Sequence, residues 1–433
     1  MLGIFVMKIN LRTIKKIYLS LYKKIYISKK ILKEEGFRTL LTKIKNKFLL
    51  YLEYFIIDRK INEKFNQIDI KIKNYDKVLI IISGIKYDSN SGGQRTIYLT
   101  NYFNKKGYFI LFVFFTWNRS EEKNFGFIKD SIFLIPLRIF FKNINFLLNK
   151  FANISKKLLI IEAPFNECFE ILSYIRSYDF ITIYDIKDDW EEFNKVNQAP
   201  WYSKTIEEYV CRNSDLIITV SPGLAKKFEY FNPHIIKNGF DPDSFDLNIK
   251  PINIKKGKIN IGYFGHLTDS WFDWDFVIDI AKKNSEYIFH IIGYGMPDKL
   301  KIPTNIVIYG KINHRLLPSY VKDWDIAIVP FKNSILSENS DPLKIYEYLY
   351  LQKPIIVKGI CHLKNHPYVF ICNNSDEFMK LIKDIKKINI DILKLNNFLK
   401  ECTWEKRFEI IELLIQNIIE RKKNYLITQW SFR

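Results

Sequence analysis

Short runs rich in Ile, Val, Leu and Phe recur along most of the chain, and each run ends in polar or Gly-containing loop residues. Apolar runs of this length predict β-strands buried on both faces, as in parallel sheets with helical crossovers. The pattern therefore predicts an α/β protein in which two doubly wound, Rossmann-like domains face one another across a cleft. The expected strands are KVLIIISGI (77–85), YFILFVFF (108–115), KKLLIIEAP (156–164), FITIYDI (180–186) and DLIITVSP (215–222), then KINIGYFG (258–265), YIFHIIGYG (287–295), NIVIYG (305–310), DIAIVPF (325–331) and PIIVKG (354–359).

A polar segment, NGFDPDSFDLNIKPINIKKGK, separates the two series of strands. It contains Gly, Pro, Asp and Lys but no apolar period, which is typical of a linker. A chain of 433 residues is long enough for two domains with extensions. We expect a basic helical extension at 1–72, a first Rossmann-like domain at 73–238, a second Rossmann-like domain at 258–388, and C-terminal helices at 389–433 that cross back to the N-terminal domain.

The formal net charge of +20 is concentrated at the N-terminus, where residues 1–70 hold sixteen Lys/Arg against six Asp/Glu. Within residues 9–32, apolar side chains recur at helical spacing and most lysines fall on the other face. Such a helix can lie on an anionic membrane surface, or it can dock by its apolar stripe on the protein itself. Both interpretations stay open. No helix-turn-helix, zinc-finger or RNP-like pattern accompanies the charge, so nucleic acid is not an expected partner.

The location of the protein is predicted from what the sequence lacks. No apolar run approaches the roughly 18 residues that a membrane-spanning helix needs. The N-terminus has neither a basic region before its apolar patch nor a small-residue cleavage site. The five cysteines are widely spaced and form no CxxC pair, which favours a reducing compartment. We expect a cytoplasmic protein, peripheral on the inner face of the membrane if the basic helix binds lipid.

The stretch ENSDPLKIYEYLYLQKPIIV (338–357) predicts an anion-binding site. Asp341 is expected to cap a helix whose first position is Pro342. Lys344 and Glu347 then lie on one face of that helix, close to its positive N-terminal end. The preceding loop follows an expected strand, and ligands of open α/β sheets bind at the carboxyl ends of strands. The alternative is an ordinary exposed Lys/Glu pair.

Several strings together resemble a known family. They are PLKIYEYLYLQKPIIV, YGKINHRLLPSYVKDWDIAIVPF, NSDLIITVSPGLAKKF, IIKNGFD and IGYFGHLTDSWFD. Between about residues 75 and 420 the chain resembles a GT-B fold glycosyltransferase of the retaining type that builds bacterial surface polysaccharides (glycosyltransferase family 4-like, group 1). The resemblance implies transfer of a sugar from a nucleotide-diphosphate sugar to a glycan or lipid-linked acceptor, without a cofactor or metal. It also implies that the domain at 73–238 binds the acceptor and the domain at 258–388 binds the nucleotide sugar. A nucleotide-sugar epimerase and a non-catalytic surface-assembly partner remain as alternatives with the same fold.

The resemblance also implies roles for individual residues. The ribose hydroxyls would bind Glu347, and the diphosphate would bind Lys344 together with N–H groups of the first helical turn. His266 and Arg95, the latter from the facing GGQR loop, are further candidates for phosphate binding. The complete set implied for the donor is Glu347, Lys344, Leu343, Pro342, Gly265, Gly310, Lys311, Phe331, Arg95 and Gly93, with His266 among the catalytic candidates.

The chain departs from the family pattern at one position. Relatives often carry a second glutamate eight residues before the one that matches Glu347, but Asn339 stands there, with Glu338 one step away. Three acidic triplets, which begin at Asp241, Asp273 and Asp323, imitate the metal-binding DxD of another glycosyltransferase fold. We interpret the triplets as structural, because the GT-B site implied by the resemblance uses no metal.

The acceptor side offers only carboxylates as bases. All six histidines lie after residue 233, so the expected acceptor domain contains none. A proton acceptor there must be Glu162, Asp185 or Asp188, which follow two expected strands. Alternatively, the leaving diphosphate accepts the proton in a retaining transfer, and the protein stabilises the developing phosphate charge. The second mechanism is the one we favour.

Overall fold

The computed structural model describes residues 61–88, 94–117, 122, 125–385 and 387–431. Of the expected basic extension, only 61–72 fall within this range, and they are helical. The candidate membrane helix at 9–32 and the candidate phosphate ligand Gly93 lie outside the described residues.

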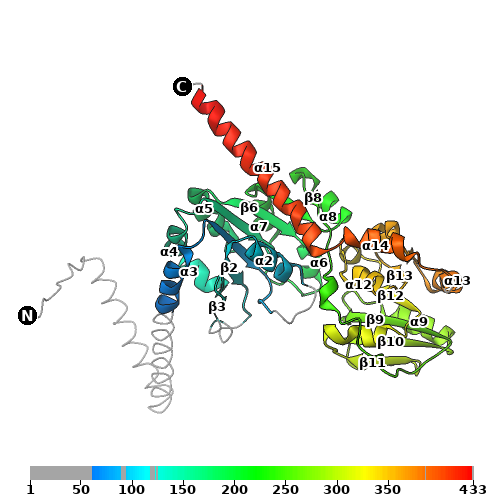
Figure 1. The fold of residues 1–433 in the computed structure, drawn as a ribbon. Helices are drawn as coiled ribbons and strands as arrows, with labels where there is room; N and C mark the ends of the chain where they lie inside the picture. The colour runs from blue at the N-terminus through cyan, green and yellow to red at the C-terminus, as the bar shows by residue number, and fades with distance from the viewer. Residues whose placement is uncertain (1–60, 89–93, 118–121, 123–124, 386, 432–433) are drawn as a thin grey trace, which may run out of the picture. The chain divides into compact units, whose positions relative to one another are not determined.

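The first sheet contains eight strands in the order β3-β4-β2-β1-β5-β6-β7-β8, with β1 near its centre (Figure 1). Adjacent strands of this sheet pair in parallel, except that β3 is antiparallel to β4. The strands are β1 Lys77–Ser83, β2 Phe109–Phe114, β3 Gly126–Lys129, β4 Ile132–Pro136, β5 Lys156–Ile161, β6 Ile181–Ile186, β7 Leu216–Thr219 and β8 His234–Ile235. The helices between them are α2 Arg95–Lys105, α3 Leu137–Lys142, α4 Ile144–Lys150, α5 Cys168–Ile175, α6 Trp190–Lys195, α7 Lys204–Arg212 and α8 Pro222–Lys227.

The second sheet has six parallel strands in the order β11-β10-β9-β12-β13-β14. Chain order reverses at β9, as in a doubly wound fold. The strands are β9 Ile259–His266, β10 Tyr287–Tyr294, β11 Ile306–Gly310, β12 Ile326–Pro330, β13 Ile355–Lys358 and β14 Val369–Ile371. The helices are α9 Trp274–Lys283, α10 Leu317–Val321, α11 Ile335–Glu338, α12 Lys344–Tyr350, α13 Ser375–Ile385, α14 Ile392–Lys400 and α15 Trp404–Ser431.

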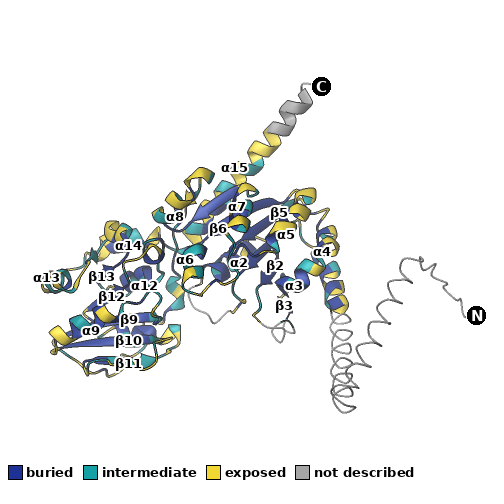
Figure 2. Cartoon of the chain, turned by 180° about the vertical axis from the view of Figure 1, so that it is seen from behind, coloured by how far each residue is buried: buried dark blue, intermediate teal, exposed yellow. Residues whose placement is uncertain are grey.

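These two sheets confirm the predicted fold class, and each expected strand is present within a few residues of its expected position. Central strands are buried along their length, as Figure 2 shows in dark blue, because helices cover both faces. The prediction missed β3, β4, β8 and β14. All four are edge or next-to-edge strands of five residues or fewer, so each gives only a short run for a sequence pattern to detect, even where the run is wholly apolar as in β4.

The chain passes between the two sheets twice, at adjacent places. Phe240, just after the first sheet, donates its N–H to the carbonyl of Cys402 and accepts from the N–H of Trp404. After this crossing, α15 packs on the first sheet's helices, where Tyr102 of α2 donates its hydroxyl to Glu412 at 2.8 Å. By contrast, α14 packs against α12 of the second sheet.

None of the helices that the structure describes is long and apolar enough to cross a membrane. All five cysteines are free thiols, and four of them are buried.

Candidate active site

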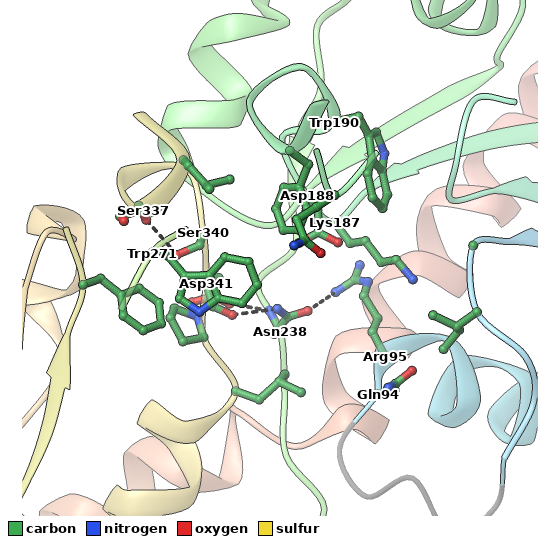
Figure 3. A pocket seen from close by; sticks show the side chains of 18 of the residues that line it. Gln94, Arg95, Lys187, Asp188, Trp190, Asn238, Trp271, Ser337, Ser340 and Asp341 are labelled. Atoms are coloured by element: carbon green, nitrogen blue, oxygen red, sulfur yellow. Dashed lines mark hydrogen bonds between the residues drawn. The ribbon is translucent and has the colours of Figure 1, made fainter. Parts of the chain in front are cut away.

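A pocket of about 460 Å³ lies where carboxyl ends of strands from both sheets meet. The first sheet contributes the loops after β1, β2 and β6 and the start of α2, and the second contributes the loops after β9 and β12 and the turn before α12. Figure 3 shows Asn238, in the linker, between Arg95 and Asp341. Open α/β sheets bind ligands at this edge, and the volume is within the ~300–1,000 Å³ of small-molecule sites.

Arg95 and Asp185, two candidates with separate expected roles, are bonded to each other. Nε and Nη2 of Arg95 donate to the two carboxylate oxygens of Asp185 at 2.8 and 3.0 Å. Nη1 of Arg95 donates to the carbonyls of Ile236 and Lys237. Both side chains are almost fully buried, at 3% and 1% exposure. Each group already satisfies the other's charge, so this arrangement does not favour the expected roles of Arg95 in phosphate binding and of Asp185 as a base, and both roles stay predictions.

Glu162 is also engaged. Its Oε2 accepts hydrogen bonds from the hydroxyl of Thr96 at 2.6 Å and from Nζ of Lys187 at 3.1 Å. The side chain is fully buried, and its Oε1 has no partner among the described residues. A carboxylate bound to a lysine at the end of β5 stabilises this loop, and it does not line the pocket.

Asp188 differs from the other two acidic candidates. It lines the pocket and makes no hydrogen bond or ion pair with the described part of the chain. Burial raises the pKa of its carboxyl to about 6, although the charge of Lys187 opposes the rise. Asp188 is thus the carboxylate at this edge of the first sheet that is placed to accept a hydrogen bond from a ligand.

Asn339, at the position where the resemblance had implied a glutamate, connects the two halves of the site. Its Nδ2 donates to Oδ2 of Asp189 at 2.7 Å, and its carbonyl accepts from the hydroxyl of Ser221 at 2.7 Å. Asp189 also caps α6 and binds Nζ of Lys227. The neighbouring Glu338 accepts from the N–H of Cys361 at 2.7 Å. A structural bridge between the sheets therefore occupies the position of the missing glutamate.

The start of α12 differs from its prediction. The helix begins at Lys344, and Asp341 does not cap it. Instead, the carboxylate of Asp341 accepts from the N–H of Asn238 at 2.6 Å and from the hydroxyl of Tyr346. The N–H of Ile345 bonds to the carbonyl of Pro342, so a tight turn precedes the helix. Pro342 and Leu343 line the pocket as part of that turn.

Lys344 is a half-buried cation beside a glycine. Its Nζ donates to the hydroxyl of Tyr263 at 3.0 Å, which leaves two N–H groups for other acceptors. Burial lowers the pKa of its ammonium group to about 8, despite the charge of Glu347. At Gly265, a Cβ would lie 2.7 Å from this Nζ, and the φ of +144° is one that residues with a side chain rarely adopt, so glycine is favoured there. Among the described residues, no carboxylate is bonded to Lys344, and the backbone of Gly265 beside it carries no side chain. Such a cation is suited to binding an anionic ligand.

Glu347 lies deeper than expected. Its Oε1 accepts a hydrogen bond from Nε2 of His314 at 2.8 Å, and the residue is only 6% exposed. The alternative of an ordinary exposed Lys/Glu pair is therefore wrong, because Glu347 is buried and the described contacts of Lys344 and Glu347 include no ion pair between them. Burial alone would lower the pKa of His314, but its bond to Glu347 and the charge of that carboxylate raise it.

The remaining donor candidates are residues at the ends of strands in the second sheet, and two of them, His266 and Phe331, lie near Lys344. His266 ends β9, and burial and then the charge of Lys344 lower its pKa, so the ring is neutral at pH 7. The ring of Phe331 lies 5.1 Å from Nζ of Lys344. Gly310 ends β11 with φ +72°, and the exposed Lys311 follows it, with its Nζ 5.3 Å from the Tyr294 ring. These residues all lie at the carboxyl edge of the second sheet.

The acidic triplets make local structural contacts. Asp273 caps α9, Asp325 accepts from the N–H of Asn260, and Asp241 accepts from the N–H of Asp243. Among the described residues, no three His, Cys, Asp or Glu side chains are grouped so that they could hold a metal ion.

Comparison with known proteins begins with sequence. No protein-family model matches the chain. A protein of Bacillus subtilis (strain 168), provisionally named as the teichuronic acid biosynthesis glycosyltransferase TuaH, is 23% identical over 245 residues. The match covers 51% of this chain and 61% of that relative, so the chain spans about three fifths of the relative's length.

Structural similarity extends over a larger part of this chain than sequence similarity does. OtsA in its apo form superposes with a TM-score of 0.55 at 11% identity, over 79% of this chain and 99% of OtsA. HepE of Anabaena, in complex with UDP and glucose, superposes with a TM-score of 0.52 at 12% identity, over 78% of this chain and 99% of HepE. The chain has the GT-B fold. A trehalose-6-phosphate synthase, studied with bisubstrate glycomimetics for glycosyl transfer with retention, superposes with a TM-score of 0.54 at 10% identity. The superposition covers 79% of this chain and 99% of the synthase.

Sequence analysis missed several residues of this GT-B site. His314, which holds Glu347, lies in a string that was quoted for the resemblance, but nothing in its spacing indicates which side chain it contacts. The sequence does not indicate Lys187 or Asn238, because their hydrogen-bond partners lie 25 or more positions away in the chain. Of the tryptophans in the pocket, Trp190 could have been found from the sequence, because it directly follows the acidic pair at the end of β6.

Proposed function

We propose that this GT-B protein transfers a sugar from a nucleotide-diphosphate sugar to a glycan or lipid-linked acceptor in the synthesis of a cell-surface polysaccharide. The observation that carries the proposal is the arrangement at the start of α12. There Lys344 presents two unused N–H groups beside Gly265, and Glu347 lies one helical turn further on. This spacing suits a diphosphate and the ribose next to it.

The chemistry of each contact supports the donor assignment. Lys344 would donate to a diphosphate oxygen as a charge-assisted hydrogen bond, which is about twice as strong as a neutral one. The bound anion would in turn favour the charged form of the lysine. Glu347, held by His314 through Oε1, would use its other oxygen to accept from ribose hydroxyls. HepE, a structural neighbour, binds UDP, and we propose the same class of nucleotide here.

We propose that the transfer proceeds with retention and needs no metal. The bond between the anomeric carbon and the diphosphate oxygen breaks, and a bond from the acceptor oxygen to the same carbon forms on the same face. The leaving diphosphate takes the acceptor proton, while Lys344 stabilises its growing charge. The fold likeness to a synthase studied for retention supports this choice. Asp188 would hold the acceptor hydroxyl by a hydrogen bond in this mechanism.

A panel of nucleotide sugars tests the proposal. The full chain is melted in the presence of each UDP-, GDP-, ADP-, CDP- and dTDP-sugar, because a ligand at about 100 times its Kd adds roughly 2.7 kcal/mol of stability. At least one donor should raise the melting temperature, and release of the nucleoside diphosphate should require an acceptor. Donor turnover without acceptor would indicate the epimerase instead, and absence of binding to every donor would indicate a non-catalytic partner.

A further inference from the structure

Four aromatic side chains form one wall of the pocket, and we call them the aromatic wall: Trp190, Phe193, Trp201 and Trp271. The ring centroids of Trp190 and Trp201 are 5.2 Å apart, and those of Trp190 and Phe193 are 5.9 Å apart. Phe193 in turn lies 5.9 Å from Trp271, which comes from the loop after β9 in the other sheet. The wall therefore runs continuously from one half of the site to the other.

The aromatic wall is not fully part of the core. Phe193, Trp201 and Trp271 remain partly exposed. Trp190 is only 8% exposed, yet its indole N–H has no hydrogen-bond partner in the described part of the structure. A buried indole N–H normally finds an acceptor. A ligand that offers both an apolar face and hydroxyl oxygens would complete this surface.

The charges around the aromatic wall argue against a phosphate at this position. The two cations on this side of the pocket, Arg95 and Lys187, are already bonded to Asp185 and Glu162. Asp188, the carboxylate without such a partner among the described residues, would repel an anion. A neutral ring with hydroxyl groups meets no such repulsion and can donate to the Asp188 carboxylate.

We propose that the aromatic wall binds a sugar ring of the acceptor, so that the group presented to this pocket is the end of a glycan. The apolar C–H face of a pyranose ring packs on the exposed faces of the indole rings, while its hydroxyls reach Asp188. This inference rests on the proposed function and names its acceptor class. An acceptor phosphate group, if the glycan carries one, lies beyond the aromatic wall.

A glycan array of bacterial surface oligosaccharides tests the inference, with the labelled full chain applied in the presence of UDP. The wild type should bind at least one glycan. Trp201→Leu should weaken that binding about tenfold, while its affinity for UDP and its melting temperature stay close to those of the wild type. Tyr230→Ala is the matched control, because Tyr230 is an aromatic residue at 79% exposure that does not line the pocket, and it should bind like the wild type.

Calorimetry with UDP on the same samples separates the two proposals. If neither UDP nor the nucleoside diphosphate of any other donor in the panel binds, the proposed function fails and the inference falls with it. If UDP binds but no glycan on the array is retained, the acceptor inference is overturned and the donor site stands; decyl phosphate, tested in parallel, then shows whether the pocket takes a lipid phosphate. Equal loss of glycan binding in Trp201→Leu and Tyr230→Ala also overturns the role of the aromatic wall.

Discussion

Nε2 of His314 lies 2.8 Å from Oε1 of Glu347, so the carboxylate assigned to the ribose is held by a residue 33 positions earlier in the chain. The ring of His314 is itself fixed, with its centroid 4.6 Å from that of Phe245 in a stacked arrangement. The second oxygen of Glu347 is thereby oriented by contacts that come from the linker and from the loop after β11. His314 is a positioning residue in this account.

His314→Phe should reduce the affinity for UDP and for uridine by a similar factor of about ten, because Glu347 loses the donor that orients it. His314→Gln should recover much of the affinity, since its amide N–H can donate to the same oxygen. Isothermal titration at pH 7 measures both. A purely structural histidine would instead lower the melting temperature in both variants and leave the affinity of the folded protein unchanged.

The pKa of Lys344, lowered by burial to about 8, predicts proton uptake on nucleotide binding. At pH 8.5 the free lysine is largely neutral, and a bound diphosphate should recharge it. The enthalpy of UDP binding should therefore depend on the ionisation enthalpy of the buffer at pH 8.5 but much less at pH 6.5. In Lys344→Met this dependence should vanish. A wild-type enthalpy that is independent of buffer at pH 8.5 would contradict the lysine–diphosphate contact.

The same shift predicts how stability depends on pH. The folded-state pKa of Lys344 lies below that of an unfolded lysine, so the unfolded chain binds more protons between about pH 8 and 10.5. The free energy of unfolding of the nucleotide-free protein should therefore gain a contribution that rises with pH across this window. Urea unfolding of wild type and Lys344→Met at pH 7.5 and 9.5 measures the difference, which should be absent if the lysine keeps an ordinary pKa.

Asp188→Asn should lower the acceptor kcat/KM by about ten- to a hundredfold, through loss of one charge-assisted hydrogen bond. The affinity for UDP should not change, because Asp188 lies on the acceptor side. NMR of the product should show the same anomeric configuration as the donor. A loss toward the ~10⁴-fold upper end of general-base effects, together with an inverted product, would instead identify Asp188 as the catalytic base.

The buried pair of Arg95 and Asp185 predicts a stability effect. Arg95→Met leaves the Asp185 carboxylate buried without its partner, which should cost about 3–5 kcal/mol of unfolding free energy. The double variant Arg95→Met, Asp185→Leu should be less destabilised than the single one, because no charge is then left unpaired. Urea denaturation measures both. If Arg95→Met weakens UDP binding without loss of stability, the guanidinium binds phosphate as the sequence alone had indicated.

The sequence predicted the central strands because their apolar runs are long and buried on both faces. It missed β8 and β14, which are two and three residues long and lie at sheet edges. The loop chemistry was harder to predict. Asp341 has the residue type and position of a helix cap, but its carboxylate instead bonds Asn238 across the linker, a long-range contact that no local pattern reveals.

In the candidate site, too, contacts between residues far apart in the chain could not be predicted from local sequence patterns. The expected strand ends and the family resemblance placed Glu347, Lys344 and Gly265 at one sheet edge, and the structure brings Lys344 and Gly265 together. The sequence did not indicate that two of the candidates, Arg95 and Asp185, are bonded to each other. Arg95 and Asp185 are 90 positions apart, so their pairing depends on the packing of α2 against the first sheet and not on any spacing in the sequence.

The most direct measurement of the central claim is a titration of wild type, Lys344→Ala and Glu347→Gln with UDP, uridine and the 2′,3′-dideoxy analogue of UDP. If Lys344 holds the diphosphate, Lys344→Ala should weaken UDP about ten- to a hundredfold and change uridine little, since a charge-assisted hydrogen bond contributes roughly 1.5–3 kcal/mol. If Glu347 holds the ribose, Glu347→Gln should weaken UDP and uridine alike and spare the dideoxy analogue. Unchanged affinity for UDP in both variants, with melting temperatures like the wild type's, would contradict the donor site and with it the proposed glycosyl transfer.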